Sequence, residues 1–145
     1  MENEIGDAEN VVFGKLAGEN RAAALGVMLR FGFDVNARGD FGPVLHHAAW
    51  TGAADAVAAL LEYFPELEEK NDFGGTALDA AVFGARHCHD PHGGNTSFGR
   101  PQDVRHGDYP RAVRLLLEAG ADANAPGIHP TGDRALDSLL EPYLR

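Results

Sequence analysis

An internal repeat constrains the fold of this chain more than any other feature of its sequence. The triplet Asp-Phe-Gly occurs at residues 40–42 and again at residues 72–74, in both places shortly before an apolar stretch. The leucines of these stretches, Leu45 and Leu78, are 33 residues apart. A fixed period of this length predicts similar helical units stacked in a row, each shielding the apolar face of its neighbour.

The second half of the unit is repeated as well. An apolar stretch followed by glycine and an Asp-x-Asn step occurs as Leu29-x-x-Gly32-x-Asp34-x-Asn36 and as Leu117-x-x-Gly120-x-Asp122-x-Asn124. The apolar spacing of Val57-x-x-Leu60-Leu61 recurs in Val113-x-x-Leu116-Leu117. Such spacing predicts a helix with one buried stripe, and glycine suits the left-handed residue after a helix end because it has no Cβ.

Three motifs resemble the ankyrin-repeat family: Val44-Leu45-His46-x-Ala48-Ala49-x-x-Gly52, Gly74-x-Thr76-Ala77-Leu78 and Leu117-x-x-Gly120-Ala121-Asp122-x-Asn124. The long loop that ends in Gly107-Asp108-Tyr109 is similar to one in small bacterial ankyrin-repeat proteins. The resemblance covers nearly the whole chain. It implies an all-α repeat solenoid, in which helix–turn–helix pairs are joined by β-hairpin-like finger loops. It also implies that partners bind in the concave groove formed by the finger tips and the first helix of each pair.

On this basis the chain is one domain, residues 1–145, with three full repeats and a capping half-repeat. The repeats are placed at about 5–37, 38–70 and 71–125, and the C-terminal half-repeat at 126–145. Helices are expected near residues 8–17, 21–30, 44–51, 54–63, 77–85, 109–118 and 135–140. Asp108 is expected to cap the helix that begins at Tyr109, with Pro110 in its first turn.

The third repeat carries an insertion at about residues 86–107, because Val57 and Val113 are 56 residues apart instead of 33. Its histidines offer candidate metal ligands, namely His87, His89, His92 and His106. Structural zinc sites usually draw ligand pairs from two separate segments, so a solvated polar loop is the favoured interpretation and a metal-binding or metal-dependent protein is the alternative. Cys88 lacks a supported base, so we expect no catalytic residues and no cofactor.

His46 stands where the ankyrin family has a histidine that bridges neighbouring fingers, and the resemblance therefore implies a structural role for it. Asp79 and Asp137 fall at the corresponding points of later units. A carboxylate there can accept hydrogen bonds from backbone N–H groups instead.

Several aromatic residues project onto the groove that the resemblance implies. The predicted partner-binding residues are Phe41, Pro43, Trp50, Thr51, Phe73 and Phe83. Rigid aromatic side chains are common anchors at the centres of protein interfaces. The alternative is that these rings pack inside the stack.

The charge balance restricts the kind of partner. With 22 acidic and 12 basic residues, the net charge of −10 disfavours nucleic acid and membrane surfaces and favours a basic protein partner. The acidic N-terminus does not resemble a secretory signal, no apolar run could span a bilayer, and Cys88 is the single cysteine. We therefore expect a cytoplasmic monomer.

Overall fold

The computed structural model describes residues 12–39, 42–87, 108–125 and 128–145, and over these residues the protein is all-helical. Residues 12–18 form a helical segment. The elements that follow are α2 (Ala22–Arg30), α3 (Val44–Trp50), α4 (Ala54–Leu61), α5 (Ala77–His87), α7 (Tyr109–Ala119), α8 (Arg134–Leu140) and the 3-10 helix η1 (Glu141–Tyr143). None of the helices in the described ranges is both long and apolar enough to cross a membrane.

The predicted helices are confirmed within the described residues, with small shifts at their ends. Helix α5 continues to His87, two residues beyond the expected end of that helix and into the start of the expected insertion. Asp108 caps α7 as predicted, because its carboxylate accepts a hydrogen bond from the backbone N–H of Arg111 at 3.1 Å. Gly120 ends α7 with φ +111, the left-handed conformation that glycine adopts without a steric penalty.

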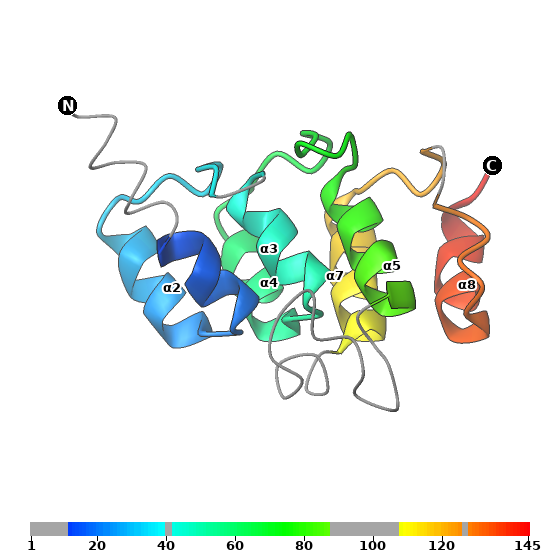
Figure 1. The fold of residues 1–145 in the computed structure, drawn as a ribbon, viewed down its shortest axis with the longest axis horizontal. Coiled ribbons are helices and arrows are strands. Elements are labelled where there is room, and N and C mark those ends of the chain that lie inside the picture. Colours follow the sequence, from blue (N-terminus) through cyan, green and yellow to red (C-terminus); the bar gives the residue numbers. More distant parts are fainter. Residues whose placement is uncertain (1–11, 40–41, 88–107, 126–127) are drawn as a thin grey trace.

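The helices pack in two layers that run side by side along the molecule (Figure 1). In the first layer, helix α3 packs on α5. In the second layer, α2 packs on α4 and α4 packs on α7. Contacts of α3 with α4 and of α5 with α7 join the layers, and α8 packs on α7 at the C-terminal end. The helices thus pack both within their own layer and against the other layer.

Small residues let α3 and α5 approach closely. Ala48, Ala49 and Ala81 are fully buried between larger aliphatic side chains. At Gly84 a Cβ atom would collide with the carbonyl oxygen of Trp50, so no larger residue fits there without moving the backbone. The same carbonyl accepts a hydrogen bond from the Tyr109 hydroxyl at 2.9 Å, which ties the start of α7 to the end of α3.

A side-chain hydrogen bond, here called the hook, joins each turn after a second-layer helix to the next segment along the row of helix pairs. The side-chain Oδ1 of Asn36 accepts a hydrogen bond from the Glu66 N–H at 2.7 Å, and a Glu68 carboxylate oxygen accepts one from the Asp122 N–H at 3.1 Å. In the same way, Asn124 accepts a hydrogen bond from the N–H of Arg145 at 3.0 Å. The hook recurs at matching positions of three successive turns, although its middle member is a glutamate.

The connections between the layers project beyond the helices as hairpin-like loops, here called fingers (Figure 1). In the first finger Val44 N–H donates to the Ala37 carbonyl at 2.9 Å and Gly39 N–H to the Gly42 carbonyl at 2.8 Å. Arg38 and Pro43 form an isolated antiparallel bridge. The second finger closes through the Asn71 N–H, which donates to the Gly75 carbonyl at 2.9 Å.

Candidate partner-binding surface

The fingers are held in place by a buried histidine. The Nε2 of His46 lies 3.0 Å from the backbone oxygen of Glu69, and its Nδ1 lies 3.2 Å from the side-chain nitrogen of Asn71. Because the Asn71 amide nitrogen can only donate, the imidazole proton must sit on Nε2 and be donated to Glu69. His46 therefore links the start of α3 to the next finger. The structural role expected from the sequence is confirmed.

The environment of His46 favours its neutral form. Its side chain is fully buried, and this burial lowers the pKa of the imidazole from 6.5 to about 4, although the hydrogen bond to Glu69 acts in the opposite direction. A neutral ring is also the form that accepts a hydrogen bond at Nδ1. The residue is thus a fixed structural link and not a proton donor for chemistry at neutral pH.

Carboxylates take the place of this histidine in the later units. Asp79 accepts a hydrogen bond from the Thr76 N–H at 3.1 Å, and Asp137 accepts one from the Thr131 N–H at 2.8 Å. The hydrogen bond from the Thr131 backbone lowers the pKa of Asp137. Both carboxylates close the turn before a helix, as predicted.

Asn71 shapes the tip of the second finger and presents Phe73. Its side-chain oxygen accepts hydrogen bonds from the N–H groups of Phe73 at 2.9 Å and Gly75 at 3.1 Å, and Gly74 has φ +85. The resulting tight turn leaves the Phe73 side chain 82% exposed. An aromatic ring is therefore displayed on a loop whose backbone is well defined.

A half-exposed arginine joins the two fingers at their outer side. The Arg38 guanidinium donates to Glu69 at 2.8 Å, to Asp72 at 3.0 Å and to the Lys70 carbonyl at 3.2 Å. Exposed ion pairs contribute about 0–1 kcal/mol each, so this group contributes less to stability than to the relative placement of the fingers.

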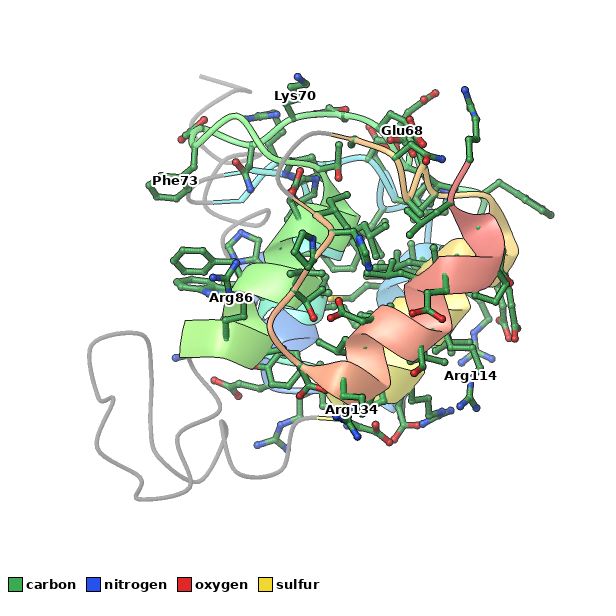
Figure 2. All side chains as sticks on the ribbon, turned by 90° about the vertical axis from the view of Figure 1, so that its right-hand side faces the viewer. Glu68, Lys70, Phe73, Arg86, Arg114 and Arg134 are labelled. Atoms are coloured by element: carbon green, nitrogen blue, oxygen red, sulfur yellow. The ribbon has the colours of Figure 1, made fainter. Side chains whose placement is uncertain are left out.

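Helix α5 adds a second aromatic side chain on the same side of the molecule. Phe83 is 47% exposed. Arg86 follows it by three residues and therefore lies on the same helix face. Figure 2 shows Phe73 and Arg86 along one edge of the molecule, while Arg114 of α7 lies on the opposite edge. We call the side of the molecule that carries Phe73, Phe83 and Arg86 the finger face.

The structure separates the predicted partner-binding residues into two groups. Phe73 and Phe83 are exposed, whereas Trp50 is half-buried and packs against the core. Pro43 is buried at the start of α3, and the Thr51 hydroxyl donates to the Gly18 carbonyl at 2.7 Å, so both serve the fold more than the surface. Phe41 lies outside the described residues.

The candidate metal ligands fall largely outside the described part of the chain. His87 is the last residue of α5, but its side chain is not among the described atoms, and His89, His92 and His106 lie outside the described residues. Over the residues that are described, no group of three or more His, Cys, Asp or Glu side chains is arranged to hold a metal ion.

Sequence reasoning missed one set of exposed aromatic residues, which lies on the turns after α2 and α4. Phe31 is 82% and Phe64 is 89% exposed, and Tyr63 is partly exposed beside them. One signal could have found them: Phe64 stands where the matching turns have Gly32 and Gly120.

Comparison with protein-family models and with curated proteins gives no match to this chain.

Proposed function

We propose that the chain is a small ankyrin-type repeat solenoid that binds another protein on its finger face. The observation that carries the proposal is the display of Phe73 and Phe83, both exposed, on a finger and on the first-layer helix that follows it. Large aromatic side chains exposed on a rigid surface are typical of interface anchors, because they bury much area and lose little rotamer entropy.

The recurring links between units support the repeat architecture. Asn36, Glu68 and Asn124 each accept a backbone hydrogen bond from the next segment. His46 links the first turn of α3 to the next finger, which agrees with the structural role that the family resemblance implies. Stacks of this kind hold their fingers in fixed register and so present a preorganised surface to a partner.

The proposed partner is a protein with basic side chains around an apolar centre. The net charge of the chain is −10, which attracts cationic surfaces and repels phosphate backbones. Asp72 and Glu69 lie beside Phe73 in the second finger, although Arg38 offsets part of their charge. Arg86 adds a position where an acidic or amide group of the partner can dock.

The test combines partner capture with a direct affinity measurement. The wild-type chain and the double variant Phe73→Ser/Phe83→Ser are used as baits in the native host, and a partner enriched by the wild type is purified and titrated by calorimetry. We expect the double variant to bind at least about tenfold more weakly. Tyr143→Ser, which alters a partly exposed aromatic residue in η1, serves as the matched control and should retain affinity. Equal affinity of the double variant and the wild type, with circular dichroism unchanged, would show that the finger face is not the binding surface.

A further inference from the structure

A second set of exposed aromatic residues lies on the turns after α2 and α4. It is made of Phe31, Tyr63 and Phe64, which we call the turn patch. Glu68, at the end of the turn that carries Phe64, lies well apart from Phe73 in Figure 2. The two turns are neighbours, because the N–H of Glu66 donates to Asn36 at 2.7 Å. The two turns that carry the patch are therefore adjacent, and the patch shares no residue with the finger face.

The backbone at Phe64 shows that the exposed ring is not incidental to the turn. Matching hydrogen bonds place Gly32, Phe64 and Gly120 at equivalent positions, since each N–H donates to the carbonyl of a leucine three residues earlier. Gly32 and Gly120 have φ +96 and +111, and Phe64 has φ +52. Left-handed backbone favours glycine and disfavours a side chain as large as phenylalanine. This turn thus carries an aromatic ring where glycine would suit the backbone better.

The surroundings of the turn patch are acidic. Residues 30–36 and 62–68 contain the exposed carboxylates of Asp34, Glu62, Glu66 and Glu68 against the single guanidinium of Arg30, so four negative charges and one positive give a net charge of −3. In a two-fold dimer formed through this patch, a net charge of −3 would face an equal net charge of −3 on the second copy. This repulsion disfavours self-association. Nucleic acid and anionic lipid are repelled for the same reason.

From these observations we infer that the turn patch binds a short basic segment of another protein, in which an aliphatic side chain covers the rings and flanking lysines or arginines meet the carboxylates. This surface is separate from the finger face. The chain would then hold two protein segments on two separate surfaces.

The test uses a defined probe. A fluorescein-labelled peptide of about 16 residues, with leucines on one helical face and lysines on the other, is titrated into the full chain, and anisotropy and amide chemical shifts are recorded. Two further peptides replace the lysines by glutamate or the leucines by serine. We expect the lysine–leucine peptide to bind and to shift the amide signals of Phe31, Phe64 and Glu66. We expect both altered peptides to bind at least about tenfold more weakly.

The variants separate binding from folding. Phe64→Gly should lower the affinity for the peptide by about fivefold or more. It should also raise the thermal midpoint of unfolding by about 2–4 °C, because glycine adopts the left-handed backbone without strain. Phe31→Ser should lower the affinity for the peptide by a similar factor. Phe73→Ser, on the finger face, should leave this affinity within about twofold of the wild type. The opposite signs of affinity and stability in Phe64→Gly cannot arise from damage to the fold.

Three results would overturn this inference: no binding of the lysine–leucine peptide at about 1 mM, unchanged affinity in Phe64→Gly and Phe31→Ser, or amide shifts centred on Phe73 and Phe83. A dimer in sedimentation that dissociates in Phe64→Gly would also overturn it, since the patch would then bind a second copy. None of these results bears on partner binding by the finger face, which is tested by its own variants.

Discussion

A single buried imidazole makes the stability of this protein depend on pH. Burial lowers the pKa of His46 to about 4, so the folded state keeps the ring neutral, while the ring in the unfolded chain takes up a proton near its ordinary pKa of 6.5. Stability therefore rises with pH over this range, because the unfolded chain binds more protons. The contribution of His46 is fully present above pH 6.5 and is lost as the pH falls toward 4.

We predict that the free energy of unfolding of the wild type falls by about 2 kcal/mol between pH 7 and pH 5 from His46 alone. Urea unfolding at several pH values measures this slope. His46→Gln is the matched variant, because its amide can still donate to the Glu69 carbonyl but does not titrate. It should lose most of the slope whatever its absolute stability. Parallel pH dependence in the two proteins would show that His46 does not titrate as its burial indicates.

At the scale of elements, the N-terminus of α4 is capped by a residue from the preceding unit. The Asn20 side-chain oxygen accepts a hydrogen bond from the Ala56 N–H at 3.0 Å, whereas Ala53, at the helix's own N-cap position, has no side chain able to do so. Asn20 also has φ +60, a left-handed conformation that asparagine tolerates better than most residues. Asn20 thus has two roles: its side chain caps α4, and its backbone adopts the left-handed conformation that the turn requires.

Two substitutions at Asn20 separate these roles. Asn20→Gly removes the cap and keeps the left-handed backbone, so we expect a loss of about 0.5–1 kcal/mol in the free energy of unfolding. Asn20→Ala removes the cap and places a Cβ in a left-handed backbone, so we expect a loss of about 2 kcal/mol. Chemical denaturation with two independent probes measures both. A glycine variant that is less stable than the alanine variant would contradict the assignment.

The sequence predicts the helices well because their evidence is local. Apolar spacing, Asp108 before α7 and Gly120 after it all act within a few residues of the helix they define, and each is found where expected. Exposure at the predicted binding site was harder to foresee. Pro43 is buried, and the Thr51 hydroxyl donates a hydrogen bond to the Gly18 carbonyl. Both side chains pack inside the protein and do not face solvent as expected.

Two features depend on contacts that the residue pattern does not contain. The hook at Glu68 replaces an asparagine and reaches Asp122, which is 54 residues away in the chain, so motif matching treats it as a departure from the pattern. The repeat pattern does not predict the turn patch, because the pattern has glycine after each second helix of a unit. Phe64 was a mismatch there, and the structure shows that this mismatch exposes an aromatic ring.

At the scale of the whole molecule, a row of units in contact mainly with their neighbours should loosen from its ends. Helix α8 packs on α7 and on η1 at one end of the row. The Asn124 side chain makes two hydrogen bonds to the C-terminal end. Its oxygen accepts from the Arg145 N–H at 3.0 Å, and its amide nitrogen donates to the Tyr143 carbonyl at 3.2 Å. In nearest-neighbour architectures the loss of a terminal link lowers local stability without reaching distant units.

We therefore predict that Asn124→Ala increases amide exchange in α8 and η1 by about fivefold, which corresponds to about 1 kcal/mol for a lost side-chain hydrogen bond. Exchange in α3 should stay within error of the wild type. Glu68→Ala is the comparison variant, because it removes the equivalent hook inside the row, between turns packed on both sides. Its effect should extend to the helices on either side, because an internal unit opens only when both of its interfaces weaken. If Asn124→Ala instead raised exchange equally in α3 and α8, the row would unfold as one cooperative block, and contacts between neighbours alone would not govern its stability.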